Sequence, residues 1–322
     1  MKFGYFLSCE EFPPAELVAQ ARLAERAGFE ALWISDHYHP WSDTQGQSPF
    51  VWSVIGALSQ ATRLPVTTAV TCPIMRIHPA IVAQAAATSA VLLEGRFVFG
   101  VGTGEALNEH ILGDPWPAAR VRREMLTEAV DIIRQLFTGD QVNYDGEFYT
   151  VVNARLYTVP DQPPPVYLSG FGQNSARLAG RIGDGYCLTM PDGELVRSFR
   201  ESGGGDKPVQ AGLKMCYGPD AAAARREAHR RWATEQLPGE LPQVLPTPRH
   251  IEQAASLVSE AAVGESIPHG PGLDGYVAAV RQFQEAGVDE LYLAQIGPAQ
   301  EEFFGFAERE LLPALRRSRA AG

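Results

Sequence analysis

Short apolar segments alternate with longer amphipathic segments along most of the chain. The short segments are rich in aliphatic, β-branched and aromatic residues. Their apolar positions do not alternate strictly with polar ones, a pattern typical of strands buried on both faces of a parallel sheet. The strands predicted in this way are residues 3–7, 31–35, 65–71, 97–101, 166–169, 186–189, 209–217 and 290–294.

The longer segments carry apolar residues at helical spacing. In the first of them Leu17, Ala21 and Ala24 fall on one face, and Gly28 ends the predicted helix. Strands and helices therefore alternate from one end of the chain to the other. The helices predicted in this way are residues 14–27, 48–61, 80–93, 119–137, 175–182, 221–236, 276–286 and 303–317.

Eight strand–helix units in alternation predict an α/β protein with the (β/α)8 TIM-barrel fold. The alternative is a doubly wound sheet, which usually has fewer strands and a glycine-rich loop after the first one. No such loop follows Leu7. The barrel is therefore the predicted architecture. Because neither a linker nor an internal repeat is evident, residues 1–322 are predicted to form a single domain.

Two segments interrupt the alternation. Residues 140–160 hold an Asp-Gly turn between two β-rich runs, which predicts a hairpin inserted after a barrel unit. Residues 237–272 are rich in proline and glycine. They are predicted to form a long loop with a short helical stretch, and a long loop in a compact barrel usually covers the active site or is disordered.

The net charge, the amino-terminal stretch and the cysteines indicate which partners and which cellular compartment to expect. The 322 residues hold 27 Lys and Arg against 38 Asp and Glu, a formal net charge of −11, which disfavours binding to nucleic acid or an anionic membrane. The amino-terminal MKFGYFLSCEEF lacks the apolar stretch of a secretory signal, and no apolar run is long enough to span a membrane. The widely spaced Cys9, Cys72, Cys187 and Cys216 predict reduced, buried thiols in a cytoplasmic protein.

In a TIM barrel the chemistry lies where the carboxyl ends of the strands meet the loops. An aspartate followed by two histidines, Asp36, His37 and His39, raises the possibility of a metal site. One histidine beside a carboxylate is more often a proton-transfer pair or a satisfied surface group, so no metal is predicted. The polar or flexible residues after the predicted strands are Glu10, Asp36, His37, Trp41, Thr71, Cys72, Gly102, Thr103, Gly104, Glu105, Asn108, Gly170, Gly172 and Thr189.

The stretch GVGTGEALNE at residues 100–109 is the most informative single motif. Its glycines allow close backbone approach, yet it matches neither GxGxxG nor GxxxxGK[ST]. A tight strand-to-helix turn explains it equally well, and Glu105 alone is an acid that stabilises a helix N-terminus. Because no dinucleotide fingerprint follows a strand, little use of NADP is predicted.

Several stretches in order resemble the luciferase-like flavin and deazaflavin oxidoreductases, and most of all the branch of coenzyme F420-dependent glucose-6-phosphate dehydrogenases. The resemblance covers nearly the whole chain and is strongest through residue 190. The stretches are SCEEF (8–12), SDHYHPW (35–41), RIHPAIVAQ (76–84), GVGTGEALNE (100–109), LFTGDQVNYDGEFY (136–149) and AGRIGDGY (179–186).

The resemblance implies a homodimeric enzyme that transfers a hydride between an alcohol or hemiacetal carbon of a small molecule and C5 of F420. It implies that His37 is the base, that Glu105 is the acid near the N1 edge of the deazaflavin, and that Trp41 and Glu10 lie on the substrate side. The Ala69–Val70 peptide is expected to be cis or strained. The residues implied to contact the cofactor are Asp36, Ala69, Val70, Cys72, Gly102, Thr103, Asn108, Ser169, Gly170 and Gly172.

The chain departs from the family's pattern at two places. The turn after the fifth strand reads GFGQ (170–173) instead of Gly-Gly-Pro, so cofactor contacts there are expected to differ. The phosphate pocket of the resembling enzymes uses a threonine, two lysines and an arginine. Thr189 remains, but Asp192 and Gln253 stand where lysines are expected. An aspartate repels phosphate, so glucose 6-phosphate is predicted to be a poor substrate unless the pocket is rebuilt by Arg249, His250, Lys214 or Arg197.

Three other hypotheses remain open at this stage. The first is a sugar-6-phosphate dehydrogenase with a rebuilt phosphate pocket. The second is a luciferase-like monooxygenase that uses FMN, although the combination of SDHYHPW with GTGEALNE favours the deazaflavin. The third is a barrel without activity, which the retention of Glu10, His37, Trp41 and Glu105 argues against.

Overall fold

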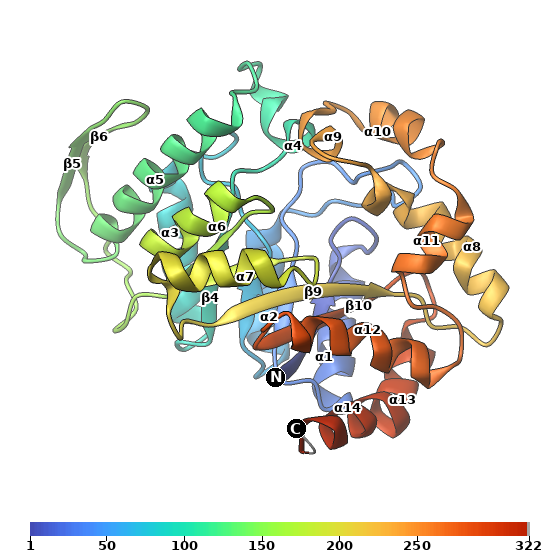
Figure 1. Cartoon of the computed structure of the whole chain (residues 1–322). Coiled ribbons are helices and arrows are strands. Elements are labelled where there is room, and N and C mark those ends of the chain that lie inside the picture. The colour runs from blue at the N-terminus through green and yellow to red at the C-terminus, as the bar shows by residue number, and fades with distance from the viewer. Residues whose placement is uncertain (321–322) are drawn as a thin grey trace.

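The computed structural model describes residues 1–320, with side chains through residue 317. Within these residues eight parallel strands close into a barrel in the order β1-β10-β9-β8-β7-β4-β3-β2, and helices surround it (Figure 1). The predicted barrel is therefore confirmed. Its strands are β1 (Lys2–Leu7), β2 (Leu32–Ile34), β3 (Val66–Thr68), β4 (Phe97–Val101), β7 (Val166–Ser169), β8 (Gly185–Leu188), β9 (Val209–Met215) and β10 (Glu290–Gln295).

All the predicted helices are present, most with ends within four residues of the expected positions. Short helical turns at His110–Leu112, Arg200–Gly204, Ala233–Gln236 and Ala307–Leu311 extend or join them. The longer helices outside the insertions are α1 (Pro14–Ala27), α2 (Val51–Ala61), α3 (Pro79–Leu92), α5 (Ala119–Leu136), α6 (Gln173–Ile182), α8 (Ala221–Trp232), α12 (Leu273–Glu285), α13 (Gln300–Phe306) and α14 (Leu312–Ala320). Two short ones, α4 (Ala106–Glu109) and α7 (Gly193–Phe199), were not predicted.

The third strand ends earlier than the sequence predicts. After β3 the chain passes through a cis peptide bond between Ala69 and Val70, and pairing resumes only as a single bridge between Thr71 and Val101. The expected cis bond at this position is confirmed. The carboxyl end of β3 therefore presents irregular backbone rather than a continued strand.

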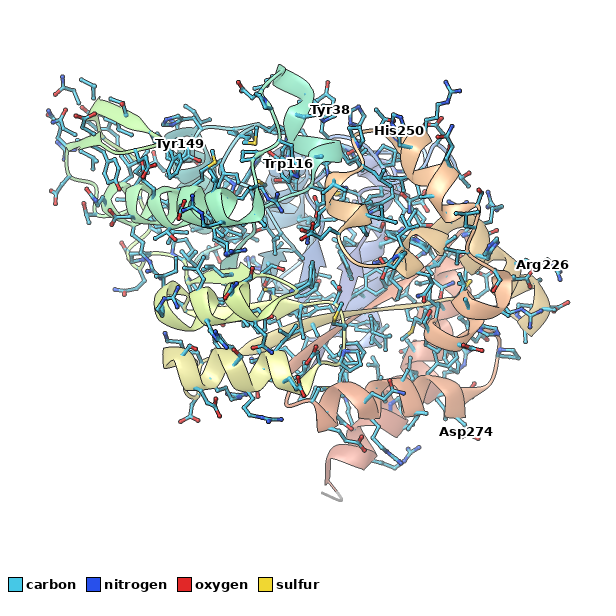
Figure 2. The ribbon with its side chains drawn as sticks, turned by 45° about the horizontal axis from the view of Figure 1, so that its top comes forward. Tyr38, Trp116, Tyr149, Arg226, His250 and Asp274 are labelled. Carbon is cyan, nitrogen blue, oxygen red and sulfur yellow. The ribbon has the colours of Figure 1, made fainter. Side chains whose placement is uncertain are left out.

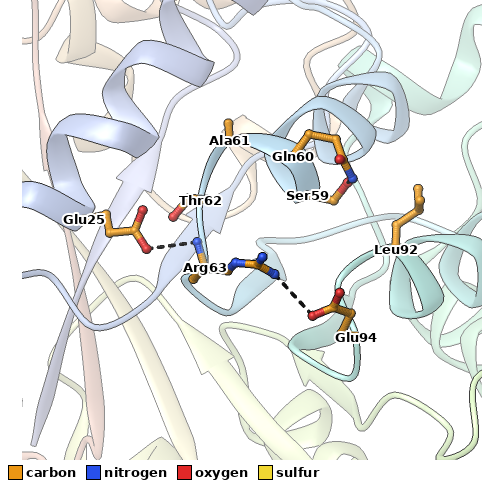
Figure 3. A pocket seen from close by; sticks show the side chains of 8 residues that line it. All are labelled: Glu25, Ser59, Gln60, Ala61, Thr62, Arg63, Leu92 and Glu94. Carbon is orange, nitrogen blue, oxygen red and sulfur yellow. Dashed lines mark hydrogen bonds and ion pairs between the residues drawn. The ribbon is translucent and has the colours of Figure 1, made fainter.

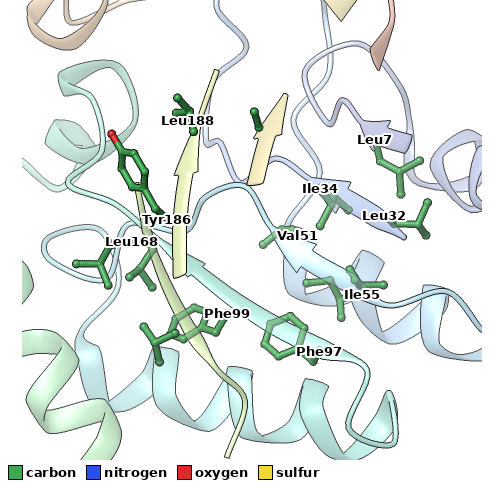
Figure 4. Packing of buried hydrophobic residues seen from close by; sticks show 14 of the residues in the cluster. Leu7, Leu32, Ile34, Val51, Ile55, Phe97, Phe99, Leu168, Tyr186 and Leu188 are labelled. Carbon is green, nitrogen blue, oxygen red and sulfur yellow. The ribbon is translucent and has the colours of Figure 1, made fainter. Parts of the chain in front are cut away.

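The barrel wall separates two hydrophobic layers because successive strand side chains point to opposite sides. Outward-facing residues such as Leu7, Ile34 and Phe99 pack against the surrounding helices, including Val51 and Ile55 of α2 (Figure 4). All five are buried, and each such side chain contributes about 1.5–3 kcal/mol when removed from water. This outer layer holds the helices against the strands.

Large rings fill the inside of the barrel. Trp33 and Tyr292 stack with ring centres 4.8 Å apart, and Trp33 Nε1 donates to Gln210 Oε1 at 2.7 Å. Gly4 makes room for this layer, because a Cβ at that position would lie 2.3 Å from the Tyr292 ring. Phe6 and Trp33 also line the cavity described below, so these rings form its floor.

The first insertion is the predicted hairpin. Its antiparallel strands are β5 (Val142–Asp145) and β6 (Thr150–Ala154). Glu128 of α5 accepts hydrogen bonds from the backbone N–H groups of Phe148 and Tyr149. The hairpin is therefore fixed to α5 through the turn that joins its strands.

The second insertion differs from the predicted long loop. It contains three helices, α9 (Leu241–Val244), α10 (Pro248–Ala255) and α11 (Glu260–Ser266). The Thr247 and Ser259 side chains cap two of them by accepting backbone N–H groups. These caps and the apolar faces between them outweigh the proline and glycine content from which a loop was predicted. Figure 1 shows α9 beside α4, next to the carboxyl ends of the strands.

Two predictions from composition can be compared with the structure. The four cysteines are buried and form no disulfide, and burial raises the pKa of each thiol, so all four are protonated at neutral pH. Among the described residues, no helix is long and apolar enough to cross a membrane.

Candidate active site

A cavity of about 530 Å³ opens at the carboxyl ends of the barrel strands. The residues that follow the strands meet there, as the barrel fold predicts. Segments from the second insertion close part of its rim. The predicted site residues that line it are Glu10, Asp36, His37, Trp41, Ala69, Val70, Cys72, Gly102, Thr103, Glu105, Ser169, Gly170, Gly172 and Thr189.

A smaller hollow of about 240 Å³ lies at the opposite, amino-terminal end of the strands (Figure 3). Arg63 pairs there with Glu94 at 3.3 Å, and the Arg63 backbone N–H donates to Glu25. Both partners of the pair are mostly exposed, and exposed ion pairs contribute little. The larger cavity is therefore the candidate active site.

Glu10 and His37 form the polar centre of the cavity. The buried Glu10 Oε2 accepts hydrogen bonds from Ser8 Oγ at 2.8 Å and Ser35 Oγ at 2.7 Å, while Oε1 lies 3.5 Å from His37 Nε2. Burial alone would raise the Glu10 pKa, but attraction to His37 and the two hydroxyl groups outweigh it and lower that pKa. An ionised carboxylate therefore faces the His37 imidazole.

The other side of the imidazole is held by its own loop. His37 Nδ1 lies 3.3 Å from the His39 carbonyl oxygen, and Ser48 Oγ donates to the His37 carbonyl at 2.7 Å. The edge of Trp41 meets the imidazole with ring centres 5.1 Å apart. The ring is thus fixed between the indole and Glu10, with Nε2 on the carboxylate side.

Asp36 belongs to a buried ionic network. It accepts from Thr71 Oγ1 at 2.8 Å and pairs with Arg76 at 2.9 Å, and Arg76 also lies 3.5 Å from Glu109. Burial raises the Glu109 pKa to about 7 despite the attraction of Arg76. The network joins the loops after β2, β3 and β4, and it fixes the position of Asp36, the residue before His37. Arg76 was not singled out from the sequence, although it begins the motif at residues 76–84.

The glycine-rich stretch after β4 has a packing explanation. Gly104 adopts φ +66°, and a Cβ there would lie 2.7 Å from Cys72 Sγ and 2.8 Å from Glu109 Cγ. The loop therefore passes close to the segment after β3. At position 104 any residue other than glycine would be strained, because of both the positive φ and the close contacts. Glu105 follows at the amino-terminal end of α4 and lines the cavity.

Asn108 is a structural partner rather than part of the cavity lining. Its Oδ1 accepts the backbone N–H groups of Tyr38 at 2.9 Å and His39 at 3.0 Å, and its Nδ2 lies 3.4 Å from Glu105 Oε2. Asn108 therefore links the histidine loop to the Glu105 loop. Figure 2 shows Tyr38 at the outer edge of this loop region.

Residues 1–300 match the family model described as luciferase-like monooxygenase. The chain belongs to the luciferase-like monooxygenase family. It is 37% identical over 332 residues to an F420-dependent glucose-6-phosphate dehydrogenase of Segniliparus rotundus, covering 98% of both chains. It is 36% identical over 334 residues to the protein of that name from Mycobacterium avium, again covering 98% of both.

Two solved structures have the same architecture as this chain. An F420-dependent secondary alcohol dehydrogenase in complex with an F420–acetone adduct superposes with a TM-score of 0.89 and 32% identity, covering 98% of this chain and 99% of the other. The F420-dependent tetrahydromethanopterin reductase from Methanopyrus kandleri superposes with a TM-score of 0.79 at 22% identity, covering 98% and 99%. At 22% identity, the comparison with the reductase shows a shared fold and nothing more.

Two of the expected substrate residues do not reach the cavity of this luciferase-like protein. Asp192 caps α7, its Oδ1 accepting the backbone N–H groups of Glu194 at 2.9 Å and Leu195 at 3.0 Å. Arg249 is exposed on α10. Neither is among the described residues that line the cavity, whereas Thr189 is. The expected repulsion of phosphate by Asp192 therefore has no support in the geometry; Asp before Gly-Glu-Leu is a helix-capping signal.

The cavity also contains Lys214 of β9, one of the cations named from the sequence as able to rebuild a phosphate pocket. Trp232 at the end of α8 and Glu235 in the segment after it line the cavity as well, and the sequence did not reveal them. Trp232 and Glu235 lie beyond residue 190, where the family resemblance weakens.

Proposed function

We propose that this protein is an F420-dependent dehydrogenase that transfers a hydride between F420 and the carbinol carbon of a small neutral alcohol. The observation that carries the proposal is the Glu10–His37 pair, which places a carboxylate-supported base inside a cavity with tryptophan walls. The named activities of the similar proteins, dehydrogenases that use F420, support the cofactor and the reaction type.

The residues of the cavity fit F420, a planar deazaflavin with a phosphate-bearing tail. The floor and walls provide apolar surface from Phe6, Val70 and Leu188. Helix α6 begins at the cavity with Gly172, and no side chain caps its first N–H groups. Free N–H groups at a helix N-terminus bind phosphate, so this end suits the tail. When bound, F420 supplies the hydride acceptor for oxidation and the hydride donor for reduction.

The chain's own residues handle the proton. In the oxidising direction His37 accepts the hydroxyl proton of the substrate at Nε2, and Glu10 stabilises the resulting imidazolium from 3.5 Å. Glu105 is proposed as the acid on the cofactor side, since it lines the cavity and is held by Asn108. Trp41 packs on the imidazole and excludes water from that side.

A sugar phosphate is the second candidate substrate. The names of the curated relatives favour it, because several are glucose-6-phosphate dehydrogenases. The cavity favours a neutral alcohol, because its inward lysine, Lys214, already pairs with Glu235 at 2.8 Å. The cytoplasmic location and the homodimer stay predictions from the sequence.

The cofactor assignment is tested by titrating the purified protein with F420, FMN and NADP. The tryptophans that line the cavity, Trp33, Trp41 and Trp232, report binding through fluorescence quenching. We expect F420 to bind at least about tenfold more tightly than FMN, and NADP to give no saturable signal. Tight retention of FMN together with no affinity for F420 would contradict the proposal and favour a flavin monooxygenase.

A further inference from the structure

The cavity holds a lysine whose charge is already neutralised. Lys214 Nζ lies 2.8 Å from Glu235 Oε1, and the side chains of the pair are 11% and 32% exposed. The ammonium also lies over two aromatic faces, 4.1 Å from the centre of the Trp232 ring and 5.8 Å from that of Phe6. Its preferred partners, a carboxylate and ring faces, are therefore all supplied by the protein.

This pair sits on the same side of the cavity as the Glu10–His37 pair. Trp232 Nε1 donates to Glu11, the residue after Glu10. Gln45 accepts from the Trp41 backbone N–H at 2.8 Å and donates to the Arg231 carbonyl at 3.0 Å. The segment that carries Glu235 is therefore tied to both loops that carry the proposed catalytic residues.

We propose that Glu235 determines substrate class by occupying Lys214 and so excluding anionic groups from the substrate end of the cavity. Without this carboxylate, Lys214 would be a buried ammonium facing the cavity, the point charge with which lysine binds phosphate. With it, an entering phosphate must displace Glu235 from Lys214 and then lie beside the displaced carboxylate. The proposal rests on the proposed function for the identity of the neutral substrate, but the exclusion of anions can be measured without turnover.

Two arginines also line the cavity, Arg122 and its neighbour Arg123 at the start of α5. Arg122 stacks on Trp116 with its guanidinium carbon 4.4 Å from the ring centre. It donates to the Pro117 carbonyl at 2.7 Å and to Gln243 Oε1 at 3.2 Å. These contacts place Arg122 with the start of α5 and the α9 segment, apart from the loops that carry Glu10 and Trp41. A phosphate bound at Arg122 would therefore not depend on Lys214.

The test is to titrate cofactor-free protein with inorganic phosphate, following tryptophan fluorescence and heat release. We expect Glu235→Gln to bind phosphate at least about tenfold more tightly than the parent protein, equivalent to about 1.4 kcal/mol. The double variant Glu235→Gln with Lys214→Met should lose that gain. Glu240→Gln removes a different carboxylate that lines the cavity and should leave phosphate binding unchanged.

Three results would overturn the proposal: no gain in Glu235→Gln, a gain that persists without Lys214, or an equal gain in Glu240→Gln. Glu235→Ala provides a second variant should the glutamine variant not fold, and the same gain is expected from it. Because these titrations need neither F420 nor alcohol, a loss of the proposed dehydrogenase function would show separately. In the loaded enzyme, Glu235→Gln should also shift kcat/KM toward glucose 6-phosphate and away from 2-propanol.

Discussion

Replacing His37 by alanine lowers kcat for alcohol oxidation by about 10²–10⁴-fold, the contribution of a positioned general base. The physical reason is that Nε2 lies 3.5 Å from the ionised Glu10, so a proton taken from the substrate is stabilised there. F420 affinity should change less than about threefold, because the apolar floor and the α6 N-terminus are untouched. Steady-state kinetics and a fluorescence titration measure the two effects separately.

The matched control is His250→Ala. His250 is exposed on α10, where it contacts Thr247, and it does not line the cavity (Figure 2). Its replacement should leave kcat unchanged. Near-normal turnover of His37→Ala combined with a loss of stability would contradict the assignment of the base. It would mean that the imidazole serves only to hold the loop through its contact with His39.

Replacing Arg76 by methionine destabilises the protein by about 3–5 kcal/mol, the cost of breaking a buried ion pair by removing one partner. The Arg76 side chain is 7% exposed and those of Asp36 and Glu109 are each 1% exposed. Without the guanidinium, two buried carboxyl groups lose their shared cation. Urea unfolding at neutral pH measures the change in the free energy of unfolding.

Arg63→Met is the control for this prediction. Arg63 pairs with Glu94 at 3.3 Å, but both side chains are at least 70% exposed, so the loss should stay below about 1 kcal/mol. An equal loss in the two variants would show that burial of the Asp36–Arg76–Glu109 network does not matter. Unchanged stability of Arg76→Met would show that the two carboxyl groups are accommodated without their cation.

The barrel could be predicted from the sequence because its signals are local. The apolar run at residues 97–101 forms β4 with those bounds, and Gly28 ends α1 in the left-handed conformation. The order of strand and helix then fixes where Glu10, His37 and Trp41 meet, since parallel strands bring their carboxyl ends to one face. Most of the predicted site residues therefore line the cavity.

The contacts that complete the site are not local and could not be predicted in this way. Trp232 donates to Glu11 across 221 positions of the sequence. Lys214 and Glu235 come together because one ends a strand and the other follows a helix that folds back over the barrel. The sequence analysis expected Asp192 in the phosphate pocket. In the structure Asp192 instead caps α7, the helix that begins at the next residue.

The most direct test of the central claim is the reduction of F420 by a simple secondary alcohol. The purified enzyme is mixed with oxidised F420 and either 2-propanol or glucose 6-phosphate, and the visible absorbance of the cofactor is followed. We expect absorbance to be lost with 2-propanol, with a kcat/KM at least about tenfold above that for glucose 6-phosphate. Rapid turnover of glucose 6-phosphate at low concentration would contradict the neutral substrate, and no reduction of F420 by any alcohol would contradict the dehydrogenase itself.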